Sequence, residues 1–282
     1  MSVRLSILLS TTLLACVPAC VKPEPTLLAL EGPVERIAFG SCAFQWEEQP
    51  IFRAIVAADP DLYLSLGDAI YGDYDGERTF DVSPDSLRAE WARLAASPDW
   101  QALRARVPVM ATWDNHDYGH HSAGAEFPLK EESKGIFLDF FGEPADSERR
   151  RRAGIYDAAI LGPEGRRVQV ILLDTRSHRS PIREHPARPE GRGPYLPLEV
   201  PGQTMLGDAQ WAWLEEQLRV PADLRIVASS IQVVASEHGW EGWCNMPSER
   251  DRLYALVRGT GAKGVVFISG DRHLVLSLIH IS

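Results

Sequence analysis

Apolar runs alternate along this chain with amphipathic segments. The runs are rich in Val, Ile and Leu and mostly lack strict alternation with polar residues, which is typical of strands covered on both faces. They cover 36–40, 61–66, 107–112, 168–173, 224–235 and 264–268. Helix start signals stand between them, with Ser83 before Pro84, then Asp208, then Pro247. The alternation predicts a layered α/β fold in one domain.

Side chains that bind metals follow four of these runs. They are Cys42 after the first run, Asp68 and Tyr71 after the second, Asp114, Asn115, His116 and Asp117 after the third, and Asp271 and His273 after the last. Ligands of open α/β sheets bind outside the carboxyl ends of the strands, so we expect these residues to converge on one site. Such a set can hold two metal ions, which is the usual apparatus for hydrolysing a phosphate ester.

The Gly-Asp-x-x-Tyr segment after the second run offers two hard oxygen ligands. Asp68 follows the strand and one glycine, and Tyr71 can turn back to the same ion. A phenolate needs a strongly acidic cation such as Fe(III) to lower its pKa from about 10. Taken alone, Asp68 would cap a turn and Tyr71 would pack on the surface, but the neighbouring clusters favour the metal role. Asp73 is a candidate for supporting contacts around the ligands.

The segment Asp114 to Asp117 is the densest polar cluster of the chain. The carboxamide oxygen of Asn115 can bind a hard cation, and Asp114 is a further candidate ligand or supporting residue. His116 is expected to face the substrate and protonate the leaving group, with Asp117 orienting its ring. An ordinary capped loop is the alternative.

Three further residues complete the candidate site. Asp271 and His273, two positions apart, can share one face and reach the same cluster. Arg176 offers a guanidinium to a substrate phosphate oxygen, although a structural Arg-Asp pair is the alternative. Cys42 can act as a metal-bound thiolate or form a disulfide with Cys244, and the pattern alone leaves both open.

Composition restricts the class of protein. With 282 residues, 45% hydrophobic and 24% charged, the chain is long enough for one substantial core. A formal net charge of −10 argues against specific nucleic-acid binding, because proteins that bind nucleic acids attract the polyphosphate backbone with positively charged surfaces. A small or extracellular phosphate ester remains compatible, since bound cations invert the local field.

The amino terminus carries a targeting signal. Residues 1–20 combine a short positive region with an apolar stretch that ends at Cys16, a pattern that resembles a bacterial lipoprotein processing site, with Cys20 as a poorer candidate. This predicts an exported periplasmic or cell-envelope lipoprotein, lipidated at Cys16 and held to the membrane by that anchor only. Cleavage near Ala19, giving a soluble periplasmic protein, is the alternative. A tether at 21–33 then leads into a single domain at 34–282.

Five motifs in a fixed order resemble one known family. They are Gly40 to Cys42, Leu66 to Tyr71, Thr112 to Gly119, Asp174 to Arg176, and Ser269 to His273. In this order they resemble the PhoD-like alkaline phosphatases, over about residues 34 to 275.

The resemblance implies a four-layer α/β/β/α metallophosphoesterase sandwich. It also implies that a metal-bound hydroxide attacks phosphomonoesters or phosphodiesters at a site holding Fe(III) and Ca(II), other divalent metals being an alternative. By the same resemblance Cys42 and Tyr71 bind the iron and Asp68 bridges the two metals. The expected protein is a monomer.

Two positions depart from the family pattern. The family usually has an acidic residue where this chain has Asn115, and its members continue after the position of His273 with further strands and another His-bearing loop. The tail at 276–282 does not resemble that continuation, so we expect it to be non-native and the last strands of the sandwich to be missing. An exposed sheet edge would then leave this polypeptide unstable or weakly active. An inactive, lipid-anchored binding or scaffold protein is the alternative function.

Overall fold

The computed structural model describes residues 30, 32–75, 77–184, 186, 190–198 and 200–278. The predicted leader with Cys16, nearly all of the 21–33 tether and the last four residues of the tail lie outside this part of the chain. Within it, no helix is both long and apolar enough to cross a membrane.

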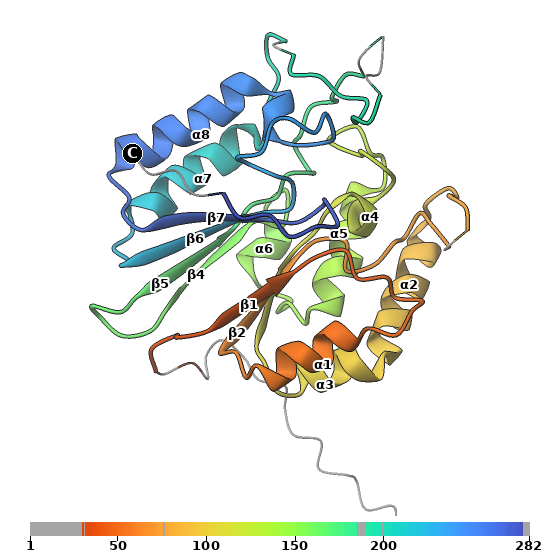
Figure 1. The fold of residues 1–282 in the computed structure, drawn as a ribbon, viewed down its shortest axis with the longest axis horizontal. Helices are drawn as coiled ribbons and strands as arrows, with labels where there is room; N and C mark the ends of the chain where they lie inside the picture. Colours follow the sequence, from red (N-terminus) through yellow and green to blue (C-terminus); the bar gives the residue numbers. More distant parts are fainter. Residues whose placement is uncertain are drawn as a thin grey trace, which may run out of the picture.

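The described residues form two β-sheets (Figure 1). Their strands are β1 (Ile37–Gly40), β2 (Leu62–Leu66), β3 (Val109–Thr112), β4 (Asp157–Leu161), β5 (Val168–Leu172), β6 (Leu224–Ser229) and β7 (Val265–Ser269). The first sheet has the order β1-β2-β3 and is parallel throughout. The second has the order β4-β5-β6-β7, and only β4 is antiparallel to its neighbour.

Each of the six predicted apolar runs contains a strand, and one strand was missed. The run at 224–235 is strand only as far as Ser229. The missed strand is β4, whose sequence begins with Asp157 and whose residues are mostly half-buried because it is an edge. A half-covered edge strand needs few large apolar residues, so it leaves only a weak sequence pattern.

Helices surround the sheets. They are α1 (Pro50–Ala57), α2 (Pro84–Ala96), α3 (Pro98–Arg104), α4 (Asn115–Tyr118), α5 (Lys130–Phe140), α6 (Glu148–Arg151), α7 (Gly207–Arg219) and α8 (Pro247–Thr260), with a 3-10 helix η2 (Trp243–Asn245). Ser83 caps α2 as predicted, since its hydroxyl accepts the N–H of Ser86 at 3.0 Å. The α7 helix starts one residue before the predicted Asp208, and Thr204 accepts the N–H of Gly207 at 2.8 Å.

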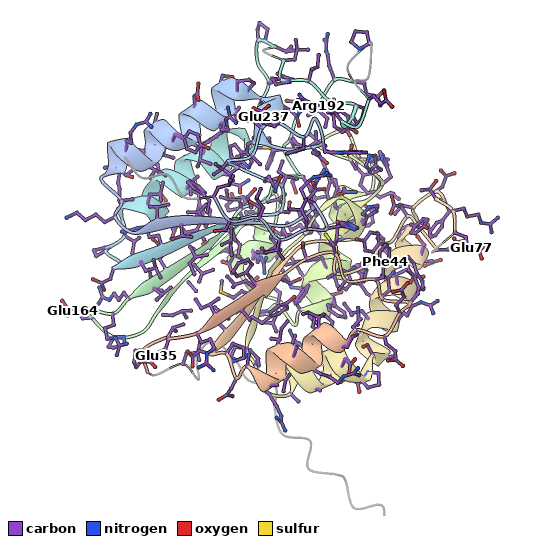
Figure 2. The ribbon with its side chains drawn as sticks, viewed as in Figure 1. Glu35, Phe44, Glu77, Glu164, Arg192 and Glu237 are labelled. Atoms are coloured by element: carbon purple, nitrogen blue, oxygen red, sulfur yellow. The ribbon has the colours of Figure 1, made fainter. Side chains whose placement is uncertain are left out.

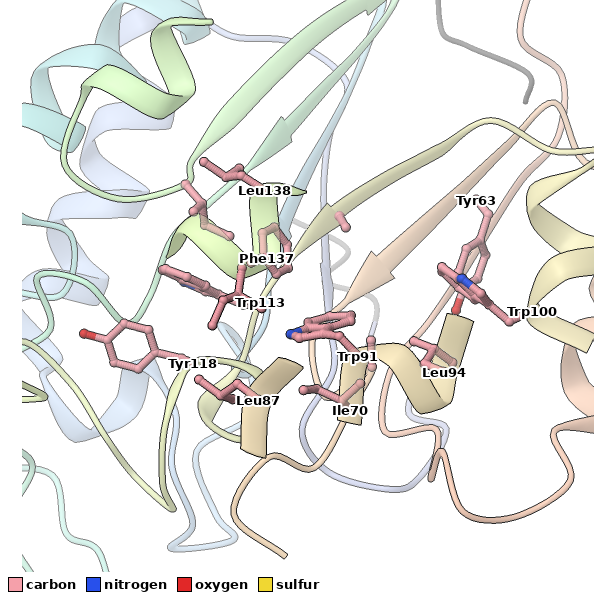
Figure 3. Close-up of a cluster of buried hydrophobic side chains, with 14 of the residues drawn as sticks. Tyr63, Ile70, Leu87, Trp91, Leu94, Trp100, Trp113, Tyr118, Phe137 and Leu138 are labelled. Atoms are coloured by element: carbon pink, nitrogen blue, oxygen red, sulfur yellow. The ribbon is translucent and has the colours of Figure 1, made fainter. Parts of the chain in front are cut away.

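Three apolar interfaces separate four layers, which is the predicted α/β/β/α architecture. Helices α7 and α8 cover the outer face of the four-stranded sheet, and α1, α2, α3 and α5 cover the three-stranded one (Figure 1). The second of these helix layers is rich in aromatic rings, among them Trp91, Trp100 and Phe137 (Figure 3). The third interface lies between the two sheets.

The burial of β2 explains why its sequence has no polar alternation. Leu62, Leu64 and Leu66 face the other sheet, whereas Tyr63 faces the helices, and all five residues are buried. The same holds for β5, where Val170 and Leu172 pack between the sheets and Ile171 packs against the α7–α8 layer. Strands covered on both faces are therefore mostly apolar, although Ser65 in β2 and Gln169 in β5 are buried polar residues.

Candidate metal centre

Loops from both sheets meet at the end of the molecule where the parallel strands finish. Figure 2 labels Phe44 just after β1 at this end, and Glu35 and Glu164, which precede β1 and β5, at the opposite end. The loops enclose a cavity of about 310 Å³. It is lined by Asp68, Asn115, His116, His121, Tyr195, Trp240, Glu241, Asp271, Arg272 and His273. Five predicted site residues thus share one cavity.

Two further predicted ligands, Cys42 and Tyr71, lie against these residues. One donor atom from each of Cys42, Asp68 and His273 lies within 4.8 Å of the other two. The Sγ of Cys42 is 3.6 Å from Oδ2 of Asp68, and the Tyr71 hydroxyl is 3.2 Å from Nε2 of His273. With Asp271 they form a set that we call the ligand cluster, namely Cys42, Asp68, Tyr71, Asp271 and His273.

The backbone of the ligand cluster is strained. Six non-glycine residues of the described chain have positive φ, and four of them belong to the cluster. Their φ values are 59° at Cys42, 50° at Asp68, 66° at Asp271 and 49° at His273. A left-handed conformation at a non-glycine residue costs on the order of 1 kcal/mol and persists only where the surroundings impose it. Such a concentration at the ends of β1, β2 and β7 marks this site as functional.

Two glycines let these loops approach one another. A Cβ on Gly67, whose φ is +99°, would lie 2.5 Å from the Cβ of Asp114. A Cβ on Gly270 would lie 2.6 Å from the Cβ of Ser41, which belongs to the other sheet's β1 loop. A side chain at either position would push apart the segments that carry the ligands.

The predicted role of Asp117 is wrong. Its carboxylate contacts no imidazole but accepts backbone N–H groups from Asp68, Ala69, Ile70 and Asp114, at 2.6 to 3.0 Å. Asp117 is buried at the start of α4 and therefore fixes the loop that carries Asp68.

Asp73 takes the role that was expected of Asp117. Its Oδ1 contacts Nδ1 of His116, and its Oδ2 accepts the N–H of His121 at 3.0 Å. Asp73 is buried, while the His116 ring borders the cavity and stacks near Tyr71 with ring centres 4.4 Å apart. The contact to Nδ1 leaves Nε2 of His116 to serve the cavity.

The ligand cluster holds acidic groups without enough positive charge nearby. Burial, and then the charges of neighbouring carboxylates, raise the pKa of Asp68 well above its ordinary value. Burial and the charge of Asp114 do the same to the pKa of Asp271. Burial followed by the charge of Asp68 raises the pKa of both the Cys42 thiol and the Tyr71 phenol.

These residues fit metal cations. Thiolate, phenolate, imidazole and carboxylate are all metal donors, and a cation among them would lower each of the raised pKa values. The Oδ2 atom of Asp271 is buried with no hydrogen-bond partner in the described part of the chain. Asn115 adds a carboxamide beside Asp68 on the cavity wall. The assignment of individual metals to these side chains remains a prediction.

The structure contradicts the assignment of Arg176 to a substrate phosphate. The side chain is fully buried, and all five of its N–H donors are taken. They go to Asp114, Glu241 and the main-chain oxygen of Ala123. The structural Arg-Asp pair is therefore the correct alternative, with Asp114 as the partner.

Arg176 belongs to a larger buried set that we call the arginine cluster, namely Asp114, Arg176, Arg179 and Glu241. Arg179 is also fully buried, and its Nη2 lies 3.0 Å from Oε1 of Glu241. Although burial opposes it, the two guanidinium charges lower the pKa of Glu241 below its ordinary value. In Asp114, Oδ1 is held by Arg176 and Ser230, whereas Oδ2 is buried without a partner among the described residues.

Several residues that line the cavity were not predicted from the sequence to belong to the site. Glu241, Trp240 and Arg272 line it, but the first two lie at the far end of the 230–242 loop, well beyond the end of β6. Tyr195, which also lines the cavity, lies in the long segment between β5 and α7. Cys42 and Cys244 are free thiols, so the disulfide alternative is not found.

Comparison with known proteins gives one family and one close fold. The sequence profile described as PhoD-like phosphatase matches residues 37–277. A solved structure titled "Structure of PhoD" superposes with a TM-score of 0.70 at 20% identity, covering 86% of this chain and 52% of that one. The chain therefore spans about half the length of that relative. The comparison with curated proteins finds no match.

A second solved structure is more distant. It is the purple acid phosphatase PPD1 from yellow lupin (Lupinus luteus) seeds, with a TM-score of 0.44 and 12% identity. The match covers 76% of this chain and 35% of that one.

Proposed function

Because this chain belongs to the PhoD-like phosphatase family, we propose that it hydrolyses phosphate esters with metal ions held by the ligand cluster. The observation that carries this proposal is the ligand cluster itself. It places Cys42, Asp68, Asp271 and His273 on strained backbone at converging strand ends, with too little positive charge to balance them. A purely structural cluster has no reason to combine strain with uncompensated charge.

The donor types favour Fe(III) together with Ca(II), with other divalent metals as the alternative. Cys42 and Tyr71 supply a thiol and a phenol, which suit a strongly acidic iron. Asp68, Asn115 and Asp271 supply oxygen atoms, which suit calcium. When bound, two such cations lower the pKa of a water and neutralise the phosphoryl oxygens.

His116 has the position of a proton donor to the leaving alcohol. Its ring borders the cavity, and the buried Asp73 fixes it through Nδ1. An imidazole held in this way presents Nε2 at a constant position, as general acid catalysis requires. The cavity is then lined by the proton donor and by the candidate ligands Asp68, Asn115, Asp271 and His273.

The cellular setting of this activity is also part of the proposal. Residues 1–20 support export, with lipid attached to Cys16 and the protein retained at the periplasm or cell envelope. Small or extracellular phosphate esters would then be the substrates. A net charge of −10 supports a protein without specific nucleic-acid binding, and we propose a monomer.

The test is hydrolysis of p-nitrophenyl phosphate and bis-p-nitrophenyl phosphate by the purified protein. We expect EDTA to abolish turnover and Fe(III) with Ca(II) to restore it. Asp68→Asn should abolish it as well, whereas the exposed Asp251 on α8 provides a matched control, Asp251→Asn, that should keep it. Turnover that survives both EDTA and Asp68→Asn would show that the metal site is misassigned.

A further inference from the structure

The charge around the cavity is strongly asymmetric. Its described lining includes three carboxylates, from Asp68, Glu241 and Asp271, and a single arginine or lysine, Arg272. A phosphate ester is itself an anion, so a positive side chain in this wall would add to the attraction of any bound metal. The sequence-based candidate for that contact, Arg176, is fully committed elsewhere.

Arg272 is the guanidinium that is still available. Its side chain is 21% exposed, in contrast to the full burial of Arg176 and Arg179. No hydrogen bond from this guanidinium is found within the described residues. Its nearest carboxylate, Oδ2 of Asp271, is 4.0 Å from Nη1, which is too far for a hydrogen bond.

Trp240 restricts where this guanidinium can lie. The Cζ atom of Arg272 stands 5.1 Å from the centre of the Trp240 ring, within the range of a cation–π contact. Trp240 lines the same cavity. The ring contacts the guanidinium without a hydrogen bond, so the N–H groups of Arg272 can still pair with two phosphate oxygens.

We propose that Arg272 binds the non-bridging oxygens of the substrate phosphoryl group, and that Trp240 positions it. This inference rests on the proposed hydrolysis and adds the residue that holds the substrate. It also places the phosphate between the loop after β7, which carries Arg272, and the loops after β2 and β3. Arg272 therefore acts on the anion, while its neighbours Asp271 and His273 belong to the ligand cluster.

The experiment compares Arg272→Gln, Arg272→Lys and the parent, all loaded with Fe(III) and Ca(II). Binding of inorganic phosphate is measured by titration calorimetry, together with KM and kcat for p-nitrophenyl phosphate. We expect Arg272→Gln to weaken phosphate binding about 10- to 100-fold and to raise KM in parallel, because a charge-assisted pair is lost. Arg272→Lys should fall between, since it keeps the charge but not the planar fork. Arg219→Gln, which changes an exposed arginine on α7, is the matched control.

The outcomes separate this inference from the proposed function. If the parent turns over ester and Arg272→Gln binds phosphate as tightly as the parent, the inference is overturned and the hydrolase stands. If the parent turns over no ester but binds phosphate through Arg272, the hydrolase fails and the anion contact stands. A parent that binds no phosphate overturns the contact. Should Arg272→Gln not fold, Arg272→Lys decides by the same binding measurement.

Discussion

Two acidic clusters lie side by side in this molecule, and they differ in how their charge is balanced. In the arginine cluster, two carboxylates meet two guanidinium groups, and Arg176 directs four of its five N–H donors to them. In the ligand cluster, Asp68 and Asp271 stand beside a thiol and a phenol, and burial raises the pKa of each.

The comparison shows how a cluster of charged residues that stabilises the fold can be distinguished from one that binds a ligand. In a balanced cluster the opposite charges offset one another and no further ion is required, so its residues stabilise the fold. An unbalanced cluster on strained backbone requires a further cation, so its residues serve a ligand. Arg176 is conspicuous in the sequence for the same reason as Asp68, since both follow apolar strands. The two residues differ only in whether oppositely charged partners in the structure balance their charge.

The largest effect is expected from breaking the balanced cluster. Arg176→Gln would leave Asp114 and Glu241 buried without their main counter-charge and should lower the free energy of unfolding by about 3–5 kcal/mol. Denaturant unfolding of the metal-free protein measures this. The control is Arg219→Gln, which breaks an exposed pair with Glu215 and should cost less than about 1 kcal/mol. Equal losses in the two variants would contradict the structural role of Arg176.

The unbalanced cluster should respond to cations instead. At 100 times its dissociation constant, a metal that binds the ligand cluster should raise the free energy of unfolding by about 2.7 kcal/mol. Asp68→Asn should remove most of this gain, and Asp251→Asn should keep it. Thermal unfolding with and without Fe(III) and Ca(II) gives the comparison. A gain that persists in Asp68→Asn would place the metals elsewhere.

A smaller effect is expected at the contact between Asp73 and His116. Asp73→Asn should lower kcat about 10- to 100-fold with little change in KM, because a misplaced imidazole impairs proton transfer rather than binding. The pH profile of kcat should shift as well, since Asn carries no charge. Asp85→Asn, on the exposed start of α2, is the control. An unchanged kcat and pH profile would show that Asp73 only supports the loop.

The smallest effect is a pH dependence of the metal-free protein. The folded-state pKa values of Asp68 and Asp271 lie above the ordinary 3.8. Burial raises the pKa of Asp117 to about 7, although the backbone N–H groups bound to its carboxylate lower it. The folded state therefore binds more protons than the unfolded state between about pH 4 and 7, and stability falls as the pH rises. We expect a loss of about 2 kcal/mol from pH 5 to pH 7 in EDTA, since one retained proton costs about 1.4 kcal/mol per pH unit.

Unfolding by denaturant at the two pH values measures this loss. Asp68→Asn should reduce it, and bound metal should remove most of it. A metal-free protein that grows more stable from pH 5 to pH 7 would contradict the uncompensated charge.

The sequence was sufficient to predict a residue's position or role wherever these depend only on neighbours in the sequence. The mostly apolar runs predicted β2 and β5, because strands buried on both faces are covered by apolar neighbours on each side. The polar residues at strand ends predicted Asp68 and Asp271 at one cavity, because parallel strands finish on one side. Neither inference required a partner residue to be known.

It was insufficient wherever a role depends on a distant partner. Arg176 was predicted to bind the substrate because its partner Glu241 could not be identified from the sequence. Glu241, which binds Arg176 together with Asp114, lies in a loop without strand or helix signals. Asp117 and Asp73 exchanged roles because adjacency to His116 in sequence is a poor guide to which carboxylate reaches its ring. Contacts between loops are set by packing, and one sequence does not record them.

The close approach of the two sheets at Gly270 has a consequence for the order of events during folding. Cys42 and His273 come from opposite ends of the domain and meet only after the sheets have docked. Closing so long a segment is entropically costly, and contacts of this range form late. We therefore expect the metals to bind after most of the domain has folded. They would then stabilise the docked sheets in the last folding step and would not nucleate the first one.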